Sequence, residues 1–411
     1  MMDHCLKRLV FRQISLNLTI LTVCLCLLQN VMAQTNGNPN PQPMTPTELQ
    51  AFGKQIQQTV RSQDAVKFRQ LFDWQTFIDR TLAEFEQNPA VQQSMKPIRQ
   101  QLQATYDGKN QGIDTELLAE IANGADYRFL SMRKEQNQYK VIFRFLRPDW
   151  SLNYHSLIIE KQQSGKLKIV DIDSFSTGEL LSQTIKWSLL PEIQKAQLSV
   201  QNKLNAEEKS RIQEQKKLYD FLNLSSEKSD PFQAYQQLAK QYKGRKTVLL
   251  RLAQDTIEKE NHKKYLQVLN VFRKYHPGDL TVELLSIDYF ILMSEFSSAL
   301  ECLDRLNASI KTVDPYLYSL RAGILIEMGD IALAGKYAGK ASEIEPNLLQ
   351  PYMHLINISV MQSNFDQTIK YLDILKSKFG FSYEDIDLSE LDNYTKFTNS
   401  TQFKKWKSNQ K

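Results

Sequence analysis

Cysteine is scarce in this chain, and most of it lies at one end. Four cysteines occur in 411 residues, and three of them, Cys5, Cys24 and Cys26, fall within the first 33. Removal of that segment would leave Cys302 alone, which excludes an internal disulfide from the remainder. A chain of this length can bury an adequate core without one. Cys302 lies on an apolar helical stripe, so we expect a packed side chain rather than a reactive thiol.

The sequence also lacks the motifs that carry most enzyme chemistry. It contains no paired-histidine zinc helix, no phosphate-binding loop, no nucleophile elbow and no Cys-x-x-Cys pair. His262, His276 and His354 lie in separate segments, so a shared metal would require three distant parts of the chain to converge. We therefore expect no metal, no cofactor and no catalytic residues.

Long blocks of one charge are missing as well. The formal net charge is +5, from 51 basic and 46 acidic residues that alternate along the chain. A nucleic-acid partner would require basic residues gathered on one face, so none is expected. The short cluster of Lys404, Lys405 and Lys407 is interpreted as solvated surface, with contact to membrane headgroups as the alternative.

The N-terminal segment has the layout of a secretory signal peptide. Basic residues precede an apolar run from Leu18 to Leu28, and Val31-Met32-Ala33 supplies the small residues that a signal peptidase recognises. We predict a signal peptide over residues 1–33, cleaved after Ala33, and hence an exported protein that is periplasmic or secreted. The alternative is an uncleaved membrane anchor formed by residues 14–32.

An α+β domain is predicted for residues 47–190, after a flexible linker of Asn-, Gln- and Pro-rich sequence at 34–46. The first part of the domain has helical periodicity, and from Asp126 the pattern alternates, which favours strands. Short turns separate these strands, so we expect a four-stranded antiparallel sheet. The expected helices span about 48–61, 64–72, 75–86, 89–106 and 114–122, and the expected strands begin near Tyr127, Tyr139, Leu152 and Leu167.

Helices followed by a curled sheet, together with Gly165-Lys-Leu-Lys-Ile-Val-Asp-Ile-Asp and then Gly178, resemble the nuclear-transport-factor-2-like superfamily. The resemblance implies a cone-shaped sheet around a pocket, in which relatives use inward Asp, His or Tyr side chains for proton transfer. A hydrolase or isomerase that uses this pocket is the alternative function. Another helix-plus-meander domain is the alternative fold.

Four residues of the sheet are the candidates for such chemistry, namely Tyr154, His155, Asp171 and Asp173. Strand alternation puts Tyr154 and His155 on opposite faces, whereas Asp171 and Asp173 share one face. They do not form a convincing catalytic set. We interpret the aspartates as solvated or turn-capping residues and His155 as a rim residue.

Residues 315–348 form a 34-residue unit that predicts two antiparallel helices. Small and large residues alternate where two helices would cross, and a Gly-Asp pair supplies the turn. The pattern is carried by Tyr318, Ala322, Leu325, Gly329, Ala334, Ala338, Ala341 and Pro346. It resembles the tetratricopeptide repeat (TPR). Arg321 departs from the family, which usually has an apolar residue there, and this predicts a rotated or half-exposed helix face.

Neighbouring segments repeat the pattern more weakly. Residues 246–279, 280–314 and 349–382 keep the length to within one residue, and a degenerate pair is expected at about 207–245. Stacking of three or more units buries a continuous core. We therefore predict an all-α, TPR-like solenoid over residues 207–382, with an irregular helix bundle as the alternative.

The TPR resemblance implies that the first helix of each pair lines a groove that holds a peptide or protein segment. The residues that this assigns to the protein-binding groove are Tyr316, Ser319, Gly323, Met353, Asn357 and Val360. The predicted function is an exported protein-binding scaffold or adaptor. The sequence does not identify its partner.

Residues 383–411 add an aromatic-rich tail after the last repeat. Its apolar members are Leu388, Leu391, Tyr394, Phe397, Phe403 and Trp406. A terminal repeat exposes an apolar face that needs covering, so we predict a capping helix. A docking motif for a partner is the alternative.

Overall fold

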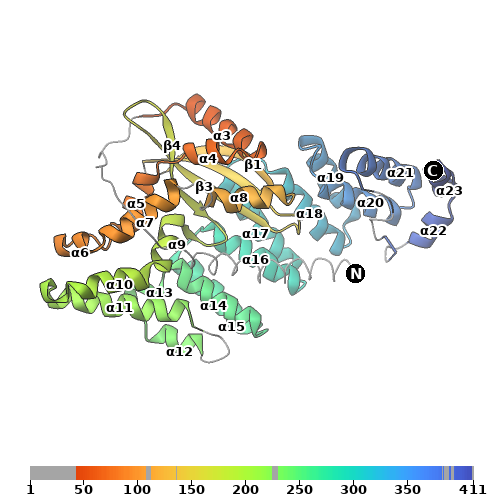
Figure 1. The fold of residues 1–411 in the computed structure, drawn as a ribbon. Helices are drawn as coiled ribbons and strands as arrows, with labels where there is room; N and C mark the ends of the chain where they lie inside the picture. Colours follow the sequence, from red (N-terminus) through yellow and green to blue (C-terminus); the bar gives the residue numbers. More distant parts are fainter. Residues whose placement is uncertain are drawn as a thin grey trace. The chain divides into compact units, whose positions relative to one another are not determined.

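The computed structural model divides the chain into two compact units (Figure 1), whose described parts are residues 43–282 and 283–409. The described residues are 43–107, 113–135, 137–224, 230–381, 383, 388–389 and 393–409. The predicted signal peptide and most of the predicted linker lie outside them. Within the described residues, no helix combines the length and the apolar character needed to cross a bilayer.

The first unit opens with helices, and Thr45 fixes where the first of them begins. The Thr45 hydroxyl accepts a hydrogen bond from the Glu48 amide at 3.2 Å, and the Glu48 carboxylate accepts one from the Thr45 amide at 2.8 Å. The helix expected over 89–106 is in fact two, because Pro97 suits the first turn of a helix and not its interior. These helices are α3 (Pro46–Arg61), α4 (Ala65–Gln70), α5 (Trp74–Leu82), α6 (Pro89–Ser94), α7 (Lys96–Asp107) and α8 (Ile113–Ala122).

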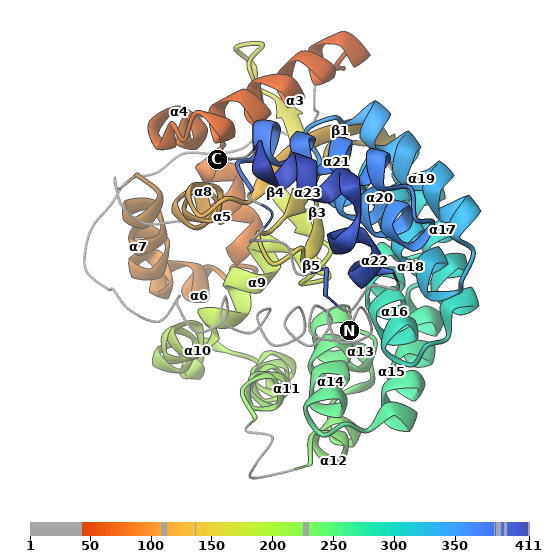
Figure 2. The ribbon, with the colours of Figure 1, turned by 90° about the vertical axis from the view of Figure 1, so that its right-hand side faces the viewer.

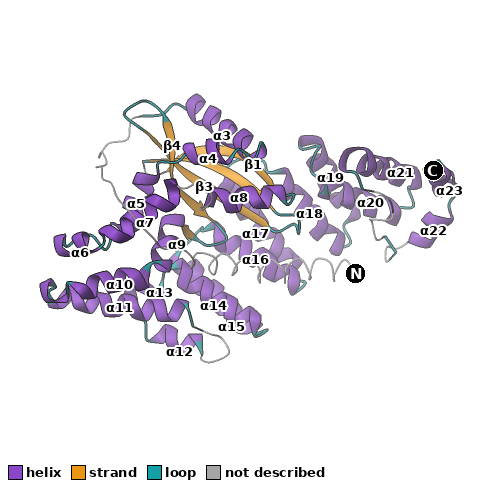
Figure 3. Ribbon diagram, in the orientation of Figure 1, coloured by secondary structure: helices purple, strands orange, loops and turns teal. Residues whose placement is uncertain are grey.

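An antiparallel sheet follows, as predicted (Figure 3). Among the described residues it has five strands and not four. In spatial and chain order they are β1 (Asp126–Glu135), β2 (Gln138–Leu146), β3 (Leu152–Lys161), β4 (Leu167–Ser174) and β5 (Glu179–Leu180). β5 is two residues long, too short to produce an alternating pattern. It follows Gly178, whose φ of +66° favours glycine and whose added Cβ would lie 3.0 Å from Leu250 Cδ1.

Strand register determines which side chains share a face of the sheet. Phe143 of β2 lies opposite Phe129 of β1 and His155 of β3, so all three point to one side. Helix α3 covers this side at β1. Gly53 allows the close approach, because a Cβ at that position would lie 2.5 Å from the Phe129 ring.

The helices after the sheet belong to the first unit up to residue 282. The first predicted repeat, residues 246–279, is the pair α14–α15, and Glu179 ties it to the sheet. The Glu179 carboxylate accepts hydrogen bonds from Trp187 Nε1 at 3.3 Å and from the Thr247 amide at 3.4 Å, and also from the Thr247 hydroxyl. The elements are α9 (Leu181–Ser188), α10 (Leu190–Ser199), η1 (Gln201–Lys203), α11 (Ala206–Leu222), α12 (Pro231–Gln236), α13 (Lys240–Lys243), α14 (Lys246–Glu258) and α15 (His262–Tyr275).

One correction follows for the start of the repeats. The degenerate pair expected at 207–245 is one long helix, α11, and two short ones. The compact units divide after residue 282, so α14–α15 lies in the same unit as the sheet.

The second unit is helical throughout its described part, and its helices come in pairs. Each pair coincides with one of the 34- or 35-residue segments found in the sequence. The pairs are α16 (Leu280–Leu292) with α17 (Phe296–Ile310), α18 (Pro315–Glu327) with α19 (Ile331–Ile344), and α20 (Gln350–Met361) with α21 (Phe365–Ile374). A turn of π-helix, η2 (Leu375–Phe379), extends α21, and α22 (Tyr394–Asn399) and α23 (Thr401–Ser408) end the chain.

Successive pairs pack through small residues on one helix and large ones on the next. α18 contacts α17, α19 and α20, and α19 contacts α20 (Figure 2). Leu355 of α20 packs with Ala322 and Ala338 of the preceding pair. Ile358, one turn further on, packs with Leu325. The small residues that define the sequence pattern therefore lie where helices from adjacent pairs meet.

Arg321, the departure from the TPR pattern, is half-buried. Its guanidinium forms an ion pair with Asp304 of α17 and lies 5.2 Å from the centre of the Tyr337 ring. The aliphatic stem thus fills an apolar position while the charge is neutralised at the edge of the packing.

Candidate functional site

Three of the predicted groove residues lie inside the helix packing and not on a surface. Tyr316 and Ser319 are 6% and 0% exposed, and Gly323 is buried. The imidazole of His354 on α20 occupies this side of α18, where a Cβ on Gly323 would lie 3.1 Å from His354 Cε1. The absence of a side chain at Gly323 therefore admits the His354 side chain of the neighbouring helix α20.

The other three predicted groove residues lie on α20 and differ in exposure. Val360 is fully buried in a cluster with Leu388 and Phe397 of the C-terminal segment. Met353 and Asn357 are half-buried. Of the predicted groove residues, these two alone offer surface, so the groove as predicted from spacing is largely filled by α20 itself and by the end of the chain.

Apolar side chains are exposed instead at the links between successive helix pairs. Val313 precedes α18, Ile344 ends α19 and Phe381 follows η2, and they are 47%, 46% and 38% exposed. One such residue thus marks each of three consecutive links. A second exposed set lies at the turns inside the pairs, where Met328 and Leu333 flank the α18–α19 turn.

In the α+β unit, the clearest polar arrangement surrounds His155 on β3. Its Nδ1 lies 3.2 Å from the Tyr127 hydroxyl, and its Nε2 lies 3.1 Å from Asn153 Nδ2. Asn153 Nδ2 also donates to the hydroxyls of Ser174 and Ser176, at 3.1 and 2.9 Å. The ring lies among aromatic neighbours, so this is a polar network within an apolar sheet face.

Hydrogen bonding assigns the proton on His155. The Asn153 Oδ1 accepts from the backbone amides of Tyr154 and Ser176, at 2.8 and 2.9 Å, which fixes the orientation of the side-chain amide. Asn153 Nδ2 cannot accept, so a hydrogen bond between it and His155 Nε2 requires Nε2 as the acceptor and the hydrogen on Nδ1. Nδ1 then donates to the Tyr127 oxygen.

The same environment argues against His155 as a general base. Burial, and secondly the charge of Arg147, lowers the pKa of His155 from 6.5 to about 3. A base is most effective when its pKa lies near the working pH, and the imidazole here is neutral and weakly basic at pH 7. Among the described residues no carboxylate hydrogen-bonds to it. The hydrolase or isomerase alternative therefore gains no support from this site.

Two of the remaining sheet candidates, Tyr154 and Asp171, are fully buried. Tyr154 lies on the opposite face from His155, as strand alternation predicts. The Asp171 carboxylate accepts from the Ser182 hydroxyl at 2.6 Å and the Ser182 amide at 3.1 Å, near the start of α9. Burial raises the pKa of Asp171, and these hydrogen bonds oppose the rise. Of the two interpretations given for Asp171, the capping one agrees with the structure and the solvated one does not.

Within the described residues, no group of three or more potential ligand side chains is placed to hold a metal ion. The network around Asn153 and His155 was only partly recognised in the sequence. The available signal was two polar residues, Asn153 and His155, two apart and followed on the same face by Leu157 and Ile159. Comparison with known proteins adds no constraint, since no family model, no curated protein and no solved structure matches the chain.

Proposed function

We propose that the chain is an exported scaffold whose TPR-like helix pairs bind a segment of another protein. The observation that carries the proposal is the equivalence of contacts between pairs. Residues 34 apart in the sequence belong to corresponding apolar clusters, as Ile326 and Val360 do, which supports a regular stack of the pairs. A stack of this kind would offer an extended, repeated surface.

The contact surface that we propose differs from the groove deduced from spacing. Val313, Ile344 and Phe381 are exposed and apolar, and they recur at consecutive links. A segment lying along these links would meet one apolar side chain per pair, with half-buried Met353 and Asn357 as further contacts. Recurrence over three links distinguishes this set from isolated exposed apolar residues, which are common on protein surfaces.

Site-specific photo-cross-linking in the organism that produces the protein tests this surface. A photoreactive amino acid is placed singly at position 344 or 381 of the full chain, and adducts are identified by mass spectrometry. We expect one partner to be cross-linked from both positions. The matched controls are positions 328 and 333, which replace residues of similar exposure, 44% and 37%, at the turns inside the pair α18–α19.

Equal cross-linking from all four positions, or none from 344 and 381, would contradict the proposed surface. The same purification tests export. Cleavage after Ala33 predicts a mature chain that begins at Gln34, and a retained N-terminal segment would instead indicate the anchored alternative.

A further inference from the structure

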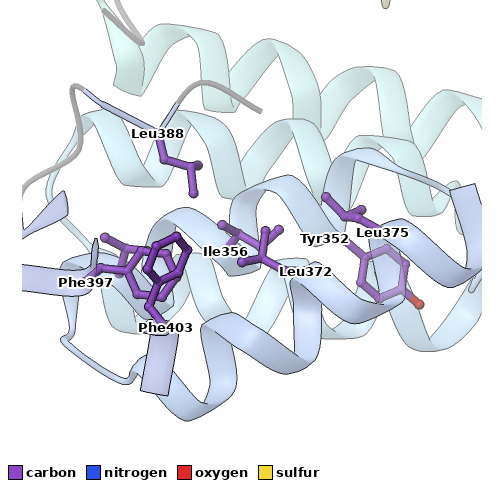
Figure 4. Packing of buried hydrophobic residues seen from close by; sticks show 8 residues of the cluster. Tyr352, Ile356, Leu372, Leu375, Leu388, Phe397 and Phe403 are labelled. Atoms are coloured by element: carbon purple, nitrogen blue, oxygen red, sulfur yellow. The ribbon is translucent and has the colours of Figure 1, made fainter. Parts of the chain in front are cut away.

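The last helix pair, α20–α21, has an apolar face that the end of the chain covers. In Figure 4, Phe397 and Phe403 lie together beside Ile356 and Leu372, and Leu388 lies over the same helices. The two phenylalanine ring centres are 4.8 Å apart. All eight residues of this cluster are at most 7% exposed, and three of them, Leu388, Phe397 and Phe403, come from the C-terminal segment.

This face corresponds to the one through which the preceding pair binds α20. Ile356 and Val360 come 34 residues after Ala322 and Ile326, which belong to the clusters that hold Leu355 and Ile358 of α20. The C-terminal segment therefore lies where the first helix of one more pair would lie. The face is built to receive a helix.

The segment depends on the face for its own structure. α22 has six residues and α23 has eight, and helices this short are unstable in water by themselves. Two hydrogen bonds join its described residues to the pair. Trp406 Nε1 donates to Asp373 Oδ1 at 2.7 Å, and Asn393 Nδ2 donates to the Met361 carbonyl at 2.9 Å. Most of the attachment is apolar contact.

We propose that the α20–α21 face is a helix-binding site which the described residues of the C-terminal segment, 383, 388–389 and 393–409, occupy within the same chain, and that this occupancy prevents a second copy from inserting its own C-terminal segment. The proposal does not rest on the link surface described above. A chain whose segment is released exposes Ile356, Val360 and Leu372, and a contiguous apolar patch of this kind drives association.

The test uses the full chain with Phe397→Ser and Phe403→Ser, which keeps the segment and removes its two buried rings. A fluorescent peptide with the wild-type sequence of residues 383–411 is the probe, and binding is measured by anisotropy. We expect the double variant to bind the peptide at least about tenfold more tightly than the wild-type chain, whose site is occupied. A peptide carrying the same two substitutions should bind at least about tenfold more weakly.

The proposal is overturned if the double variant retains its helical circular dichroism yet binds the peptide no better than wild type. Equal binding of wild-type and substituted peptides also overturns it. A chain ending at residue 382 is the second variant, and it should bind the peptide and self-associate in sedimentation, with added peptide restoring the monomer. Met328→Ser with Leu333→Ser, which alters exposed apolar residues elsewhere in the unit, should leave peptide binding at the wild-type level.

Discussion

At the scale of single residues, glycines show how closely elements approach. Gly53 on α3 faces the Phe129 ring, and an added Cβ would lie 2.5 Å from it, whereas nothing lies within 4 Å of a Cβ added to Gly339 on α19. In an open helix position, Gly→Ala stabilises by reducing the freedom of the unfolded chain. At a crowded position, the gain is lost to overpacking.

We therefore expect Gly53→Ala to lower the free energy of unfolding by about 1–3 kcal/mol. Gly339→Ala, the control, should raise it by about 0.5–1 kcal/mol. Urea titration monitored by circular dichroism measures both. Similar shifts for the two variants would mean that the Phe129 ring turns aside at little cost, and α3 would then not be fixed on the sheet by Gly53.

At the scale of helix pairs, equivalent positions in successive pairs carry apolar side chains in one pair and hydroxyl side chains in the next. The pair α18–α19 joins its helices through Leu325 and Ala334, both buried in one cluster. The next pair has Ser359 and Thr368 at the corresponding places, and their hydroxyls are hydrogen-bonded at 2.8 Å. Thr368 looks out of place in the sequence because the TPR pattern requires a small residue there. Its partner, Ser359, is smaller than the leucine at the corresponding place in the preceding pair, so it leaves room for Thr368, and it also satisfies the Thr368 hydroxyl.

Replacing Ser359 and Thr368 together should convert their hydrogen-bonded arrangement into the apolar one of Leu325 and Ala334. Ser359→Leu with Thr368→Ala keeps the number of side-chain heavy atoms, and we expect its stability to lie within about 1.5 kcal/mol of wild type. Ser359→Leu alone should destabilise by about 1–3 kcal/mol, because Leu and Thr overfill the site. Urea unfolding of the two single variants and the double variant gives the coupling energy. Additive effects would show that the two positions do not share a site.

At the scale of the whole molecule, each unit contains a histidine whose folded pKa is depressed. Burial lowers the pKa of His155 to about 3 and that of His354 to about 4, from 6.5, although a hydrogen bond with the Ser319 backbone partly opposes the second shift. The unfolded chain then binds more protons than the folded one between these values and 6.5. Each histidine therefore contributes stability that is present above about pH 6.5 and is lost as the pH falls.

Burial raises the pKa of Asp288 to about 7, so its contribution to stability changes with pH in the opposite direction. Comparing each histidine variant with wild type separates the two contributions, because Asp288 is present in both proteins. Between about pH 6.5 and pH 5, a histidine of this kind costs up to about 2 kcal/mol. Between about pH 6.5 and pH 5, we expect His155→Gln, and separately His354→Gln, to lose less free energy of unfolding than wild type does. Urea unfolding at both pH values measures this loss. If the variant and wild type differ in free energy of unfolding by the same amount at both pH values, the histidine titrates normally in the folded protein.

Local pattern in the sequence determined the elements of this protein. Helix pairs fall within the predicted 34-residue segments because small residues at helical spacing specify where helices cross, and the sheet begins where the period changes near Asp126. Sequence patterns did not predict β5 or the break before Pro97. Two residues are too few to show a period, and one proline can either end or begin a helix. Only tertiary structure decided which faces are free. Gly323 and Val360 have the spacing of groove residues, yet His354 of α20 lies against the first and the C-terminal segment packs on the second. Burial therefore depends on neighbours in space that the local pattern does not specify.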